Sequence, residues 1–85
     1  MQANTEYHYI FYTTAGCHLC DEAIAMLSHD FKDKLEQIGL CDIANEDVLI
    51  DTYGTRIPVI EALSSSQEIA WPFTKDSLSN FFKSF

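Results

Sequence analysis

The chain has 85 residues, which is enough for one domain and no more. Hydrophobic residues make up 47 % of it, so it can bury a modest core, and this argues against a disordered chain. Its 13 acidic and 5 basic side chains give a formal net charge of −8, which argues against nucleic acid and anionic membranes as partners.

The N-terminal segment carries no targeting signal. Residues 1–6 are polar without a basic region, and the apolar run over residues 7–12 is too short for a signal core or a membrane span. We therefore expect a cytoplasmic protein in which residues 1–85 form a single domain. The odd number of cysteines, 3, also argues against a secreted disulfide scaffold.

The first half of the chain predicts two strands and two helices. Residues 7–12 are aromatic and β-prone and predict a buried strand. A helix is predicted from His18, because apolar residues recur at three- and four-residue steps: Leu19, Ala23, Met26, Leu27 and Phe31.

Residues 36–43 predict a second strand with Ile38 and Leu40 as its apolar content. Asn45 suits the N-cap of a short helix through Tyr53, which Gly54 would end in a left-handed conformation.

The second half predicts a hairpin and a last helix. Strands over residues 57–63 and 68–71 are separated by the serine run 64–66. Thr74 can cap a helix whose apolar stripe is Leu78, Phe81, Phe82 and Phe85. The order is β-α-β-α-β-β-α, an α/β fold. The helices between the first three strands predict crossovers and parallel pairing, and the short serine link predicts an antiparallel hairpin.

Cys17 and Cys20 form a C-x-x-C where the first strand gives way to the first helix. Residues three apart on a helix share a face at about 5–6 Å, which suits a disulfide. The helix N-terminus should lower the pKa of Cys17 below about 8.5, and a protonated His18 would act in the same direction. Asp21 and Glu22 oppose both effects. The pattern thus predicts a dithiol–disulfide oxidoreductase in which Cys17 attacks and Cys20 resolves.

Two other functions stay open for the same cysteines. One is a metal or iron–sulfur cluster site, although Cys41 and the histidines show no ligand spacing, so redox chemistry is favoured and no metal residue is assigned. The other is a non-catalytic protein-binding module with Trp71 and Phe73 at its contact surface. Cys41 itself is interpreted as a small core residue.

Ile57-Pro58 begins the third predicted strand. Proline lacks the N–H that a strand interior needs, so the bond is either cis or an ordinary trans bond at an edge strand. The local sequence favours the trans bond.

Both motifs resemble the glutaredoxin-like proteins of the thioredoxin superfamily. Residues 16–23, Gly-Cys-His-Leu-Cys-Asp-Glu-Ala, match a small subgroup, residues 53–59 look like its second motif, and the similarity covers nearly the whole chain. The resemblance implies a thioredoxin fold with a four-stranded mixed sheet flanked by three helices. It also implies a cis Pro58 beside the cysteines and an Ile57 backbone that pairs with the substrate's cysteine segment.

The resemblance is incomplete where such proteins hold glutathione. The lysine before the first cysteine is replaced by Thr14 or a neighbour. The Gly-Gly pair and acidic residue before the last helix are replaced by Trp71-Pro72-Phe73-Thr74, with Asp76 only loosely comparable. We therefore expect no bound cofactor, a protein disulfide as substrate, and a thiol reductant or reductase as donor, with glutathione the less favoured reductant. We expect a monomer. His18 and Arg56 join Ile57 and Pro58 as candidate substrate-binding residues, with a solvated surface charge as the equal alternative for Arg56.

Overall fold

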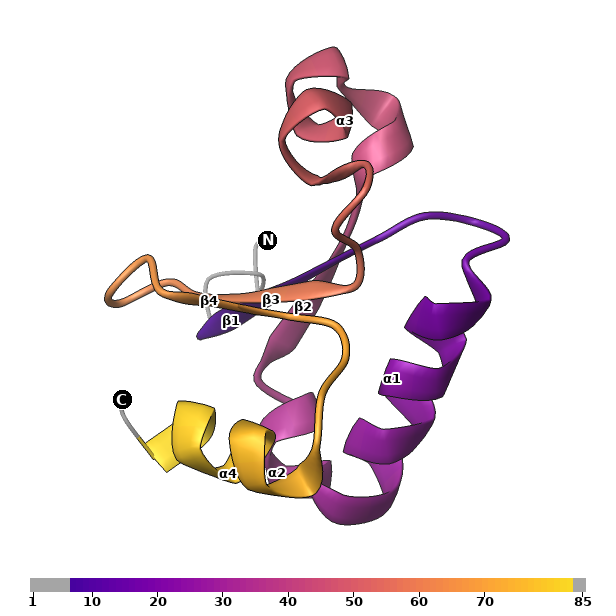
Figure 1. Cartoon of the computed structure of the whole chain (residues 1–85). Coiled ribbons are helices and arrows are strands. Elements are labelled where there is room, and N and C mark those ends of the chain that lie inside the picture. The colour runs from indigo at the N-terminus through magenta and orange to yellow at the C-terminus, as the bar shows by residue number, and fades with distance from the viewer. Residues whose placement is uncertain (1–6, 84–85) are drawn as a thin grey trace.

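In the computed structural model, which describes residues 7–83, four strands form one mixed sheet in the order β2-β1-β3-β4 (Figure 1). The strands are β1 (Tyr9–Thr13), β2 (Ile38–Asp42), β3 (Val59–Ala62) and β4 (Glu68–Ala70). β1 pairs parallel to β2 and antiparallel to β3, which pairs antiparallel to β4. The predicted mixed sheet and final hairpin are confirmed, whereas the predicted parallel pairing of the third strand is wrong.

The reversal of β3 follows from how short its connection to β2 is. A 3-10 turn (Ile43–Asn45) and α3 (Asp47–Tyr53) lie between the two strands. A helix of seven residues is about 10 Å long, and a parallel crossover would have to carry the chain back along the whole sheet. The chain instead enters β3 at the end of the sheet where β2 stops, so β3 runs in the opposite direction.

Strand alternation divides the core between the two faces of the sheet. α1 (His18–Asp30), α2 (Lys32–Leu35) and α4 (Lys75–Lys83) lie on one side and α3 on the other (Figure 1). The larger core cluster, on the α1 side, consists of Tyr9, Phe11, Cys20, Ala23, Leu27, Ile38, Ile60, Ala62, Phe73, Leu78, Phe81 and Phe82. The smaller cluster, on the α3 side, consists of Ile43, Tyr53 and Val59.

Several expected apolar positions differ from the structure. Leu40 is 65 % exposed on the edge strand β2, and Leu19 is 40 % exposed in the first turn of α1. The short helix α2 was not predicted. On α4 the stripe of Leu78, Phe81 and Phe82 is buried as expected, and Phe85 lies outside the described residues.

Thr74 caps α4 as predicted. Its hydroxyl oxygen accepts the Ser77 N–H at 2.9 Å, and the Ser77 hydroxyl oxygen accepts the Thr74 N–H at 2.9 Å. This reciprocal pair satisfies two backbone donors at the start of the helix, as a capping box does. None of the helices within residues 7–83 is long and apolar enough to cross a membrane.

The predicted end of α3 at Tyr53 is confirmed, whereas the predicted Asn45 cap and the left-handed conformation of Gly54 are wrong. Asn45 belongs to the 3-10 turn, and Glu46 occupies the N-cap without a side-chain hydrogen bond to the helix. Gly54 has φ −53° and ψ −35°, an ordinary right-handed conformation. What makes this position a glycine is space, because an added Cβ would lie 2.5 Å from the Ile50 carbonyl oxygen.

This distinction between space and backbone angle predicts a contrast between two glycines. Gly54→Ala and Gly54→Asn should both lower the free energy of unfolding, by about 1–3 kcal/mol, because each adds the clashing Cβ. Gly16 has φ +81° and open space around it, so Gly16→Asn should cost less than Gly16→Ala there. Urea unfolding of the four variants measures both differences. An Asn that is better tolerated than Ala at position 54 would contradict the steric explanation.

Candidate functional site

Cys17 and Cys20 are joined by a disulfide, with their α-carbons 5.2 Å apart. Cys17 is the N-cap of α1, and its sulfur accepts the backbone N–H of Cys20 at 3.1 Å. Cys20 is only 2 % exposed and belongs to the larger core cluster, whereas Cys17 is half-buried and packs against that cluster. The Cys17 sulfur is therefore the more accessible of the two.

The chain reaches this position through a tight turn after β1. Gly16 adopts a left-handed φ of +81°, which a residue without a Cβ accommodates at little cost. The Cys17 N–H donates to the Thr14 carbonyl at 3.3 Å, and the Asp21 N–H donates to the Cys17 carbonyl at 3.2 Å. These hydrogen bonds fix Cys17 between the end of β1 and the first turn of α1.

The Ile57-Pro58 segment lies at the same end of the sheet. Tyr12, the next-to-last residue of β1, pairs with Val59, and Pro58 directly precedes Val59. The Ile57–Pro58 peptide bond is cis, and so is Trp71–Pro72, which the sequence did not single out. Pro58 is fully buried, and its carbonyl accepts the Trp71 N–H at 3.0 Å.

One of the two polar backbone groups of Ile57 is already hydrogen-bonded. Its N–H donates to the Tyr53 carbonyl at 3.1 Å, while its carbonyl accepts no hydrogen bond from any of residues 7–83. Its side chain packs against the larger core cluster, as do those of Cys17 and Trp71. Three segments thus converge at one end of the sheet: the start of α1, the Ile57–Pro58 bond and the Trp71 loop.

The two charged candidates are both held by carboxylates. His18 Nε2 lies 3.1 Å from Glu22 Oε2 one turn along α1, and both side chains are largely exposed. Arg56 donates to Glu68 at 2.7 Å, and its guanidinium lies 5.3 Å from the centre of the Tyr53 ring. The structure therefore brings Ile57 and Pro58 to the cysteine end of the sheet but occupies the Arg56 guanidinium with a partner on β4.

Arg56 belongs to a tyrosine–glutamate cluster that sequence reasoning missed: Tyr12, Tyr53, Glu61 and Glu68. The two rings stack with their centres 4.1 Å apart. The Tyr12 hydroxyl donates to Glu61 and the Tyr53 hydroxyl donates to Glu68, each at 2.6 Å. Glu61 and Glu68 lie opposite each other in the β3–β4 hairpin. Because the sequence predicts that hairpin, it could have indicated that the two carboxylates lie close together.

Burial and hydrogen bonding shift the pKa values in this cluster. Burial, reinforced by the hydrogen bond to Glu61, raises the pKa of Tyr12 far above its usual range. Burial also raises the pKa of Tyr53, with a further contribution from Glu68. Burial alone would raise the pKa of Glu68, but the hydrogen bonds from Tyr53 and Arg56 bring it below its ordinary value.

Cys41 is a free, half-buried thiol on β2, beside Tyr12. Burial raises its pKa, and the nearby carboxylates of Glu46 and Asp42 raise it further. Within residues 7–83 no three His, Cys, Asp or Glu side chains gather closely enough to hold a metal ion.

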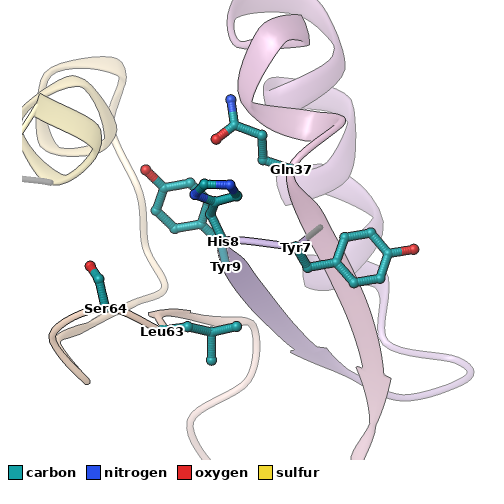
Figure 2. A pocket seen from close by; sticks show the side chains of 6 residues that line it. All are labelled: Tyr7, His8, Tyr9, Gln37, Leu63 and Ser64. Atoms are coloured by element: carbon teal, nitrogen blue, oxygen red, sulfur yellow. The ribbon is translucent and has the colours of Figure 1, made fainter. Parts of the chain in front are cut away.

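A surface hollow of about 470 Å³ lies at the opposite end of the sheet, away from the disulfide. It is lined by Tyr7, His8, Tyr9, Gln37, Leu63 and Ser64. Figure 2 shows the Tyr7 ring turned away from Tyr9 and Ser64, across β2. The residues that line the hollow lie around the start of β1, just before β2 and just after β3, so the hollow is separate from the cysteine site.

Comparison with known proteins places these features in a family context. The family model described as Glutaredoxin-like domain (DUF836) matches residues 8–83. The X-ray structure of protein XcR50 from X. campestris is 26 % identical, with a TM-score of 0.78, over 91 % of this chain and 97 % of that one. The solution structure of protein Ne2328 from Nitrosomonas europaea is 27 % identical, with a TM-score of 0.71, over 86 % and 87 %. No curated protein matches the chain.

The lowered pKa of Glu68 predicts an acid-dependent loss of stability. Because the folded state holds this carboxylate ionised, its contribution is present above the usual pKa of 4.5 and is lost as the pH falls through the lower folded value. Glu68→Gln should therefore cost about 1 kcal/mol or less at neutral pH, because solvent screens the carboxylate of this exposed residue, and it should cost less still in acid. Unfolding free energies measured across the acid range test this.

Tyr53→Phe serves as the graded control, because it removes one of the two donors to Glu68 and leaves Arg56 in place. Its stability curve should fall between those of the wild type and Glu68→Gln. Three curves that stay parallel from neutral to acid pH would contradict the hydrogen-bonded carboxylate.

Proposed function

We propose, for a chain that belongs to the family of glutaredoxin-like domains, that its Cys17–Cys20 pair exchanges electrons with the disulfides of other proteins. The observation that carries the proposal is the disulfide itself, with one accessible sulfur at a helix N-terminus and one buried sulfur a turn later. An accessible thiol that attacks and a neighbouring thiol that resolves the mixed disulfide are the two parts that a dithiol exchange uses.

The exchange takes place in two steps. The Cys17 thiolate attacks one sulfur of the substrate disulfide, forms a mixed disulfide and releases the other substrate sulfur as a thiolate. The Cys20 thiolate then attacks the Cys17 sulfur, re-forms the Cys17–Cys20 disulfide and releases the second substrate thiolate. Two electrons pass to the substrate, and a thiol reductant, such as a reducing cytoplasm provides, returns them to the pair.

Position distinguishes the roles of the two cysteines. The Cys17 sulfur faces the positive end of the 13-residue helix α1 and accepts the Cys20 N–H, and both interactions stabilise a thiolate. Cys20 is nearly inaccessible to an external disulfide but lies within bonding distance of Cys17. Cys17 is therefore the nucleophile and Cys20 the resolving thiol.

The neighbouring segments supply a place for an extended substrate. The free carbonyl of Ile57 is an acceptor that a substrate backbone N–H can fill, and buried Pro58 holds it beside the end of β1. The Arg56 guanidinium, engaged with Glu68, has no comparable opening for an anion. This favours a protein disulfide over glutathione as the bound partner.

The cysteine roles predict distinct outcomes for single substitutions. Reduced wild-type protein should accelerate the reduction of 2-hydroxyethyl disulfide, and Cys17→Ser should abolish that acceleration because the nucleophile is gone. Cys20→Ser should instead accumulate a mixed disulfide on Cys17, visible as a mass increase. Alkylation followed by mass spectrometry identifies the cysteine that carries the adduct.

Cys41→Ser is the matched control, because Cys41 lies on β2 outside the disulfide. It should keep the wild-type rate. The proposal fails if wild-type protein gives no acceleration with any thiol reductant, or if Cys17→Ser retains full activity.

A further inference from the structure

The surface beside the disulfide is acidic. Asp21 and Glu22 stand in the first turns of α1, directly after Cys20, and both are exposed. Asp42 ends β2 beside Thr13, the last residue of β1. Glu46 and Asp42 both raise the pKa of the Cys41 thiol through their negative charge.

The basic side chains lie elsewhere or are already paired. Lys32 and Lys34 are on α2 and Lys75 begins α4, at the end of α1 opposite to the cysteines (Figure 1). Lys75 lies 4.0 Å from Asp30, which ends α1. Lys83 ends α4, and Arg56 is paired with Glu68. The chain has 5 Lys and Arg in all, so these account for every permanent cation.

Within residues 7–83, the histidine that follows Cys17 is also matched by a carboxylate. His18 follows Cys17, and its ring lies 3.1 Å from Glu22. Even when His18 is protonated, Asp21 and Glu22 together outweigh it. The positive end of α1 acts over about one turn, so a substrate group outside that turn meets a net negative surface.

Resting on the proposed function, we infer that Cys17 selects disulfides in positively charged surroundings and discriminates against anionic ones such as glutathione disulfide. The exchange chemistry is the two-step transfer already described, with the reduced pair as electron source. Charge alters the frequency of productive encounter, since a surface of one sign attracts partners of the other. The predicted substrate class is a disulfide flanked by lysine or arginine.

The test uses full-length protein, reduced beforehand and freed of reductant, so that each molecule reacts once. Three small disulfides are compared: cationic cystamine, neutral 2-hydroxyethyl disulfide and anionic dithiodiglycolate. Oxidation of the pair is followed by alkylation and mass spectrometry. The readout is the ratio of the cystamine rate to the dithiodiglycolate rate, because a change in the nucleophilicity of Cys17 affects both rates and cancels.

The double variant Asp21→Asn/Glu22→Gln should lower this ratio about tenfold at low salt. The control Asp33→Asn/Glu36→Gln changes the net charge equally at the far end of α1 and should leave the ratio near the wild-type value. Raising the salt from about 0.01 M to about 1 M shortens the screening length from about 30 Å to about 3 Å, so the wild-type ratio should shrink.

Each outcome decides between the two proposals. If the neutral disulfide is reduced but the ratio is the same in wild type and both variants, the charge selection is wrong and the oxidoreductase proposal stands. The selection is also wrong if the two double variants lower the ratio equally, because net charge alone would then explain it. If the neutral disulfide is not reduced at all, the proposed function fails and this inference fails with it.

Discussion

The hydrogen-bonded register between β1 and β3 is the constraint on which the candidate site depends. Tyr12 lies opposite Val59 in an antiparallel pair, so the end of β1 and the start of β3 share one end of the sheet. The turn to Cys17 leaves from that end, and Pro58 enters there. Had β3 run parallel to β1, Pro58 would lie at the opposite end, beside the hollow near Tyr9, and the two motifs would have been separated by the length of the sheet.

A second set of contacts fixes the Ile57-Pro58 segment from the other face. The Tyr53 carbonyl takes the Ile57 N–H, while the Tyr53 ring stacks on Tyr12 and its hydroxyl donates to Glu68 on β4. The end of α3 is thereby joined to both β1 and β4. Within residues 7–83 the Ile57 carbonyl accepts no hydrogen bond, so the position of Tyr53 determines that the carbonyl, and not the N–H, is the open half of this backbone.

The sequence was informative where a feature is local. The C-x-x-C at a strand-to-helix junction, the hairpin and the Thr74 cap each depend on neighbouring residues, and each was found. The direction of β3 and the exposure of Leu40 depend on strand order, which no local pattern contains. The pairing of Arg56 with Glu68 on β4 likewise joins segments distant in sequence, which no local pattern contains.

Gly54 shows a subtler limit of the same reasoning. A glycine after a helix usually serves a left-handed turn, and Gly16 does have that backbone angle. At Gly54 the reason for the glycine is steric instead, because an added Cβ would clash with the Ile50 carbonyl oxygen. The sequence shows where a glycine stands. Only the packing shows whether its backbone angle or the lack of space for a Cβ is the reason.

The first turn of α1 combines two opposing electrostatic effects. Its backbone N–H groups stabilise negative charge on the Cys17 sulfur, whereas Asp21 and Glu22 oppose that charge. Carboxylates at this place therefore disfavour the thiolate form of Cys17, the proposed nucleophile, which the helix favours. The proposed selection accounts for their presence. The same carboxylates that destabilise the thiolate attract a cationic disulfide. The reactivity of Cys17 and the charge of its substrate are then set by one turn of helix, and neither can be changed there without the other.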